Sequence, residues 1–237
     1  MRVWVTRAQP DAAATAARVA ARSFEPLVAP LLAAEPLPDA LLDLAGVAAL
    51  AFTSRRGVSA FAAREPGRGW PVFAVGDATA AAAREAGFGQ VLSAGGDVDD
   101  LARLIAGRPP AGPVLHPGAL EPAGDLAGAL RSAGLEVRTA ALYRTRTLPP
   151  SPEAAGAWPS LQAVLLHSPK AARALAEAAL PPGPAAILCL SPAVAAPLLE
   201  ASDGLAAQVR IAASPDEAAL LDLLGQGAPL GAGPAPS

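Results

Sequence analysis

The sequence predicts an α/β protein with two similar domains, each a parallel sheet flanked by helices, and three observations carry that prediction. A short apolar run, a turn rich in small residues and an Ala-rich helical stretch follow one another six times within 237 residues. The apolar runs are continuous rather than alternating, which is typical of strands covered on both faces of a parallel sheet. Segments about 115 residues apart also resemble one another, which suggests two copies of one domain.

The six repeated units are expected to run as strand, turn and helix. They begin in the segments Arg2–Arg7, Ala48–Val58, Pro71–Ala80, Pro113–Leu120, Gln162–Leu175 and Ala185–Leu199. A further strand is expected near Pro26–Ala33, after the first helix. Two Pro-rich stretches, Glu35–Ala40 and Thr147–Pro159, have the composition of connectors.

The internal similarity indicates how these units are shared between the domains. It places Ser54 on Ser168, Gly76 on Ser191 and Asp97 near Asp216. The last part of the chain lacks a counterpart of the Pro113–Leu120 unit, whereas the first part offers a strand and a helix. We therefore assign residues 1–34 and 160–237 to one discontinuous domain and 37–143 to an inserted one, with linkers at 35–36 and 144–159. The segment from about 225 to 237 is mainly Gly, Pro and Ala, and we expect it to be disordered.

Composition and charge exclude several classes of protein. One Cys and two His leave no disulfide and no cluster with the spacing of a metal site. The balance of 18 basic and 21 acidic residues lacks the electrostatic footprint of a nucleic-acid-binding protein. The longest uncharged stretch, Ala178–Leu199, is interrupted by five prolines, and charged residues precede any signal-like apolar run. We therefore expect a cytoplasmic protein that does not enter a membrane.

The familiar cofactor and hydrolase motifs are absent. No GxGxxG follows a predicted strand, and the sequence contains no P-loop, GxSxG elbow or HExxH. Small polar residues instead follow the predicted strands, at the edge where open α/β sheets bind ligands. They are Thr6, Thr53, Ser54, Gly76, Thr79, His116, Ser168 and Ser191.

Each of these residues also has an ordinary structural interpretation. A Ser or Thr before a helix can simply cap it, and a His at the end of a strand can be a hydrogen-bonded part of the core. Taken together, several helix N-termini at one edge favour an anionic ligand. Arg7 lies in one of the turns and suits such a ligand, although a solvated surface charge is the alternative. Tyr143, the only Tyr, is expected near the domain junction, either in the site or as a packed aromatic.

Taken in order, these turns resemble the uroporphyrinogen-III synthase family. The matching segments are VTR at Val5–Arg7, Pro30, FTSRRGV from Phe52, VGDATA from Val75, GGDVDDL from Gly95, HPGAL from His116, GLEVRTAALYRT ending at Thr145 and LHSPKAARAL from Leu166. They extend over nearly the whole chain. Their number, order and spacing are more specific than any one of them.

The resemblance implies a fold and an activity. The family has two α/β domains joined by a two-stranded linker, and its enzymes cyclise hydroxymethylbilane, a linear tetrapyrrole, to uroporphyrinogen III with loss of water and inversion of the last pyrrole ring. No metal or organic cofactor is implied. The implied general acid is Tyr143, since a phenol is protonated at neutral pH. The implied substrate-binding residues are Arg7, Thr53, Ser54, Gly76, Thr79, His116, Ser168 and Ser191.

One departure from the family pattern concerns Ser191. Many members carry Gly-Pro-Thr-Thr-Ala after the penultimate strand, whereas this chain has Ser191-Pro192-Ala193-Val194-Ala195. Ser191 can replace a missing hydroxyl, or the contact is lost. Two alternatives remain open for the whole chain: a non-catalytic tetrapyrrole-binding or regulatory relative, and a two-lobed binding protein of the periplasmic type, which the lack of a signal-like segment disfavours. We expect a monomer, and a transient contact with hydroxymethylbilane synthase stays open.

Overall fold

The computed structural model describes residues 1–181, 183, 185–201 and 205–226. The chain divides into two compact units: Met1–Ala33 with Arg146–Ser237, here called unit 1, and Ala34–Thr145, called unit 2. The domains expected from the sequence had their limits at residues 34, 37, 143 and 160. The expected disordered tail lies outside the described residues from 227 onward, while Gly225 and Gln226 end a 3-10 helix.

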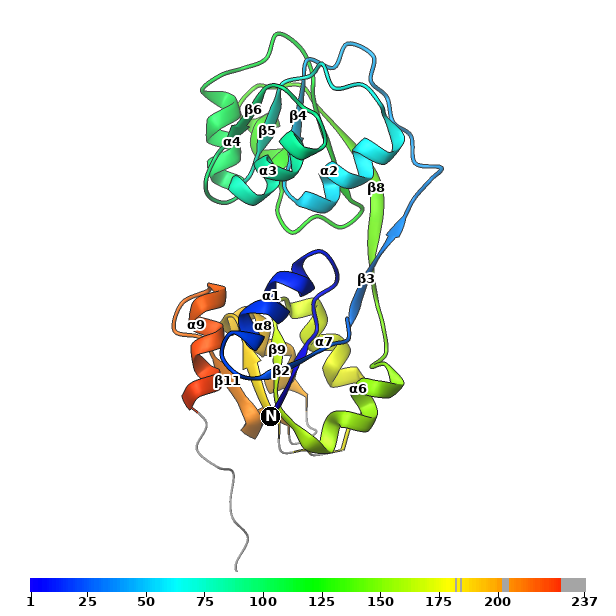
Figure 1. The fold of residues 1–237 in the computed structure, drawn as a ribbon. Helices are drawn as coiled ribbons and strands as arrows, with labels where there is room; N and C mark the ends of the chain where they lie inside the picture. Colours follow the sequence, from blue (N-terminus) through cyan, green and yellow to red (C-terminus); the bar gives the residue numbers. More distant parts are fainter. Residues whose placement is uncertain (182, 184, 202–204, 227–237) are drawn as a thin grey trace, which may run out of the picture. The chain divides into compact units, whose positions relative to one another are not determined.

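Unit 1 contains a parallel sheet with the strand order β11-β10-β9-β1-β2 (Figure 1). The strands are β1 (Arg2–Val5), β2 (Glu25–Val28), β9 (Leu161–Leu166), β10 (Ala186–Cys189) and β11 (Val209–Ile211). The helices are α1 (Asp11–Ala20), α6 (Pro152–Ala157), α7 (Pro169–Glu177), α8 (Pro192–Glu200) and α9 (Glu217–Asp222), with 3-10 turns η1 (Trp158–Ser160), η2 (Leu205–Gln208) and η3 (Leu223–Gln226).

Alternate residues of these strands enter different cores. Trp4 packs in a cluster with buried residues of α6, α7 and α8. Val3 and Val5, its neighbours in β1, belong to a second cluster with residues of α1 and α9. Both faces of the sheet are therefore covered by helices, which explains why the strands are continuously apolar.

Unit 2 contains a sheet with the strand order β3-β8-β7-β4-β5-β6. The strands are β3 (Leu32–Pro36), β4 (Ala49–Phe52), β5 (Val72–Ala74), β6 (Val91–Ser93), β7 (Val114–Ala119) and β8 (Val137–Thr147). The helices are α2 (Arg55–Arg64), α3 (Asp77–Glu85), α4 (Val98–Ala106) and α5 (Leu126–Ser132). Leu50 and Phe52 pack with residues of α2 and α3, whereas Ala49 and Ala51 pack with residues of α4 and α5.

The two units repeat one arrangement of parallel strands. The spatial order β2-β1-β9-β10-β11 in unit 1 matches β8-β7-β4-β5-β6 in unit 2. The two units are related by a circular permutation, because the chain enters equivalent strands at different points. Ser54 and Ser168 share an extended backbone, with φ and ψ of −159° and 153° and of −149° and 149°. The sequence therefore predicted the two-domain α/β class correctly, although the structure adds the strand–helix pairs β6–α4 and β11–α9 to the six units expected.

The predicted connectors differ most from the structure. The chain crosses between the units within β3 and β8, which pair with each other. The expected single strand at 26–33 is two strands, β2 and β3. Most of the expected linker 144–159 is regular structure, because β8 continues to Thr147 and α6 follows it. Pro152 occupies the first turn of α6, where a missing amide hydrogen costs nothing, and Trp158 is buried against Trp4.

Within the described part of the chain, every helix is too short or too polar to span a bilayer.

Candidate functional site

The turn between β4 and α2 brings Ser54 to the tyrosine. Ser54 is the N-cap of α2, and its Oγ accepts a hydrogen bond from the Gly57 amide at 3.0 Å. The same Oγ lies 3.1 Å from the phenol oxygen of Tyr143 in β8, and either hydroxyl can be the donor. Tyr143 is only 7% exposed. Ser54 thus has the capping role that was the alternative interpretation, and it contacts Tyr143 as well.

Gly57 allows this turn to approach β7 closely. A Cβ at Gly57 would lie 2.9 Å from the Pro117 carbonyl oxygen, which is closer than real Cβ atoms come. The first turn of α2 therefore rests directly against the β7 backbone. The absence of a side chain at this position helps to place Ser54 beside Tyr143.

A second pair lies at the same edge of the unit 2 sheet. The Thr53 Oγ1 lies 3.2 Å from Nε2 of His116, which is 6% exposed. Burial lowers the pKa of His116 to about 4, so its ring is neutral at neutral pH. His116 therefore supports Thr53 from within the fold, as in the structural interpretation of this residue.

Gly76 and Thr79 lie on the next turn and helix. Gly76 is the N-cap of α3, with φ −155° and ψ 175°, and its carbonyl accepts from the Thr79 amide at 3.1 Å. The nearest atom to a Cβ at Gly76 would be the Gly96 carbonyl oxygen at 3.9 Å, so the position has room for a side chain. Thr79 is 5% exposed and belongs to the buried face of α3. The structure thus brings Thr53, Ser54, His116 and Tyr143 into two contacting pairs and keeps Thr79 within the packing.

The two candidate serines of unit 1 differ in what their side chains do. Ser168 caps α7, and its Oγ accepts from the Ala171 amide at 3.2 Å. Ser191 caps α8 through its backbone alone, in the conformation that Gly76 has in unit 2. Thr6 is buried and donates to the Leu165 carbonyl at 2.7 Å, so its hydroxyl has a structural partner.

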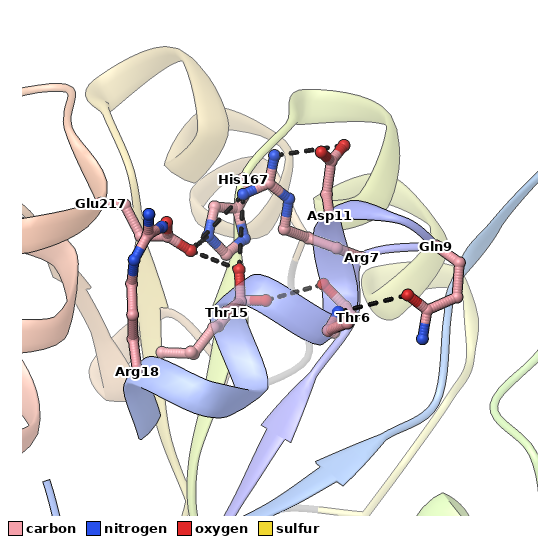
Figure 2. Close-up of polar contacts among 10 residues, drawn as sticks. Thr6, Arg7, Gln9, Asp11, Thr15, Arg18, His167 and Glu217 are labelled. Atoms are coloured by element: carbon pink, nitrogen blue, oxygen red, sulfur yellow. Dashed lines mark hydrogen bonds and ion pairs between the residues drawn. The ribbon is translucent and has the colours of Figure 1, made fainter. Parts of the chain in front are cut away.

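Arg7 lies in a polar cluster at the carboxyl ends of the strands in the unit 1 sheet (Figure 2). Its guanidinium reaches Asp11 at 3.4 Å, the Thr15 hydroxyl at 3.4 Å and the Glu217 carboxylate at 3.5 Å. Burial lowers the pKa of Arg7 below its usual value. The alternative of a freely solvated charge is therefore wrong, because the side chain is only 30% exposed and is held by these partners.

Glu217 is the centre of this cluster, and the sequence did not single it out. Its carboxylate also contacts Thr15 and Arg18, and it lies 3.7 Å from Nε2 of His167. Burial, and then the charge of Arg7, lower the pKa of His167 to about 3. The only signal in the sequence was the position of Glu217 directly after the capping residue Asp216.

The described residues hold no cluster of metal-ligand side chains, and their cysteine is buried. Among the described residues, no group of three or more His, Cys, Asp or Glu side chains could hold a metal ion. Cys189 is fully buried, and burial raises the pKa of its thiol to about 12. The arrangement therefore offers hydroxyl, phenol, imidazole and guanidinium groups.

Comparisons with known proteins agree on one family. The family model described as "Uroporphyrinogen-III synthase HemD" matches residues 13–222. The uroporphyrinogen-III synthetase structure from Helicobacter pylori is similar, with a TM-score of 0.67 at 19% identity, covering 95% of this chain and 98% of that chain. A mutant uroporphyrinogen III synthase from the extremely thermophilic bacterium Thermus thermophilus gives a TM-score of 0.53 at 20% identity, covering 95% and 96%. Curated protein sequences give no match. At these identities the two structures are similar to this chain in fold.

Proposed function

The chain belongs to the uroporphyrinogen-III synthase family, and from that premise we propose that it cyclises hydroxymethylbilane to uroporphyrinogen III. The reaction removes water and inverts the last pyrrole ring. The proposal includes a cytoplasmic, monomeric enzyme that needs no metal or organic cofactor and contacts hydroxymethylbilane synthase transiently. The observation that carries the chemistry is the contact between Ser54 Oγ and the Tyr143 phenol.

Tyr143 supplies the proton for the first step. The hydroxyl of the substrate's hydroxymethyl group leaves as water when the phenol transfers its proton to that oxygen, and the pyrrole nitrogen's electron pair forms the azafulvene. A positioned general acid of this kind accelerates a reaction by roughly 10²- to 10⁴-fold. The substituted carbon of the last ring then bonds to the azafulvene carbon to give a spiro intermediate, and the bond from that ring carbon to its original bridge breaks. The unsubstituted α-carbon of the inverted ring bonds to the freed bridge and loses its proton, which restores the Tyr143 phenol.

Ser54 is suited to stabilise the phenolate that the first step leaves behind. Its Oγ accepts from the Gly57 amide, which uses a lone pair and leaves the hydroxyl hydrogen free to turn. While the Tyr143 phenol directs its single hydrogen to the substrate, the Ser54 hydroxyl can donate to the phenol oxygen 3.1 Å away, and after proton transfer it donates to the phenolate. A hydrogen bond to a charged group is stronger than one to a neutral group, so this contact favours the charged state.

The remaining residues have binding roles in the proposal. Hydroxymethylbilane carries acetate and propionate side chains, and the protein must hold it in one conformation against unassisted closure to the type I isomer. The residues proposed to bind it are Arg7, Thr53, Gly76, Thr79, His116, Ser168 and Ser191. His116 and Thr79 act mainly by supporting the turns, because both are nearly buried.

The test resolves the product isomers. Hydroxymethylbilane is generated in situ by a purified preceding synthase, this protein is added, and the oxidised products are separated as type I and type III. We expect predominantly type III. If a demonstrably folded sample gives type I product at the rate seen without the protein, the proposed synthase activity is overturned. That result would favour the alternative of a non-catalytic binding relative.

A further inference from the structure

Glu217 interrupts the repeat between the two units. Asp97 and Asp216 occupy equivalent positions, and each carboxylate accepts from a first-turn amide. In unit 2 the residue after this cap is Val98, which packs against an apolar core. In unit 1 the residue after the cap is Glu217, which pairs with Arg7. The Glu217 side chain is only 16% exposed. A carboxylate in so buried a position is unfavourable unless it is paired, so its partners indicate its role.

These partners come from three other segments of unit 1. Thr15 and Arg18 lie on α1, Arg7 lies in the turn after β1, and His167 lies in the turn after β9 (Figure 2). Arg18 is 56% exposed and faces the solvent side. Arg7 is the partner at the edge of the sheet where ligands bind in this type of fold.

The contacts orient Arg7 without saturating it. Its three described acceptors lie 3.4 to 3.5 Å away, which is longer than a charge-assisted hydrogen bond of roughly 2.7 to 2.9 Å. A guanidinium has about five N–H donors in a planar fork that matches a carboxylate. Arg7 therefore keeps donors that can bind one carboxylate more.

His167 provides an independent indication that a polar ligand belongs beside Arg7. Its side chain is 10% exposed, and both ring nitrogens are buried with no hydrogen-bond partner among the described residues. Burial and the nearby Arg7 lower the pKa of His167, so the ring is neutral and can donate one hydrogen bond and accept another.

We infer that Glu217 is a positioning residue, which orients Arg7 to bind a carboxylate of the substrate beside His167. The inference rests on the proposed function for the identity of that substrate. Glu217 does not touch the reacting atoms. Its role is to hold a long, flexible cation in the conformation that binds, so its removal weakens binding more than turnover.

A double-mutant cycle tests whether Glu217 acts through Arg7. Glu217→Gln, Arg7→Gln and the double variant are compared for KM and kcat with hydroxymethylbilane. We expect Glu217→Gln to raise KM by about tenfold, on the order of one charge-assisted hydrogen bond, with kcat within about twofold. In the Arg7→Gln background, Glu217→Gln should have no further effect on KM. The matched control is Arg18→Gln, which removes the exposed partner of Glu217 and should leave KM unchanged.

Two outcomes overturn the inference. Effects on KM that add in the double variant show that Glu217 does not act through Arg7, and an equal rise in KM for Arg18→Gln shows that any break in the cluster suffices. A second measurement does not depend on activity: the Nε–H signal of Arg7 in NMR relaxation should report an ordered side chain in the wild type and in Arg18→Gln, and a mobile one in Glu217→Gln. Unchanged order in Glu217→Gln refutes the positioning role. A wild type that makes no type III product refutes the proposed function instead.

Discussion

The Ser54 hydroxyl and the Tyr143 phenol lie 3.1 Å apart, although 89 positions separate them in the chain. Ser54 reaches this position as a helix cap, and Tyr143 reaches it because β8 lies beside β7. A capping residue thus also contacts the group proposed to donate the proton. Substitutions at Ser54 and at a second helix cap separate these two roles.

Ser54→Ala should lose both the cap and the partner of Tyr143. We expect about 1 kcal/mol less stability from the cap and roughly a tenfold lower kcat from the weaker support of the phenolate. Ser151→Ala is the matched control, because Ser151 caps α6 by accepting from the Ala154 amide at 3.2 Å. None of the contacts described for the Ser151 side chain involves a candidate site residue. Urea unfolding and steady-state kinetics measure the two effects. Equal kcat in both variants would contradict the catalytic role of Ser54.

Gly57→Ala should displace the first turn of α2 from β7. The new Cβ would lie 2.9 Å from the Pro117 carbonyl oxygen, and backbone on both sides must move. We expect a loss of about 1 to 3 kcal/mol, the usual cost of overpacking, although Ala is the better helix former. Gly69→Ala is the control within unit 2, since nothing lies within 4 Å of its Cβ. Thermal unfolding of the two variants decides; equal stability would show that the close approach does not constrain the turn.

His116 should make unit 2 less stable in acid. Its pKa is lowered to about 4 in the folded chain, whereas an unfolded histidine titrates near the reference value of about 6.5. Between these values the unfolded state binds the proton and the folded state does not. The contribution of His116 to the free energy of unfolding is therefore fully present above about pH 6.5 and is lost as the pH decreases toward 4. We expect a loss on the order of 3 kcal/mol over this range.

His116→Gln tests this origin of the acid sensitivity. It keeps a polar atom for the Thr53 hydroxyl but cannot take up the proton. The variant should show a flatter dependence of the urea midpoint on pH between 7 and 4 than the wild type. Parallel curves would mean that other groups cause the acid loss.

Cys189 should be unreactive until unit 1 opens. It is the only cysteine, it is fully buried, and its pKa is raised to about 12. At neutral pH the thiolate fraction of Cys189 is therefore lower by about a thousandfold than that of an ordinary thiol. Labelling by a thiol reagent should follow the rate of unfolding in denaturant. A rapid reaction of the whole sample under native conditions would contradict the packing described for β10.

The parts of the site that follow from local pattern could be predicted from the sequence. A strand, a small polar residue and a helix occur in order, so the caps at Ser54 and Ser168 were accessible from the sequence alone. Glu217 was not, because its contact with Arg7 spans 210 residues and depends on which helices cover the sheet. The helix α6 was missed because a composition of Pro, Ala and Gly is typical of a connector, whereas the structure shows a helix capped by Ser151 with Ala154 buried, followed by the buried Trp158.

The most direct test of the account uses the fact that Tyr143 is the only tyrosine in the chain. Replacing tyrosine throughout by fluorotyrosines of increasing acidity changes one phenol and nothing else. If Tyr143 donates the proton to the departing hydroxyl, the alkaline limb of the kcat–pH profile for type III formation should move to lower pH with each more acidic phenol. An alkaline limb that stays in place across the series would contradict Tyr143 as the general acid.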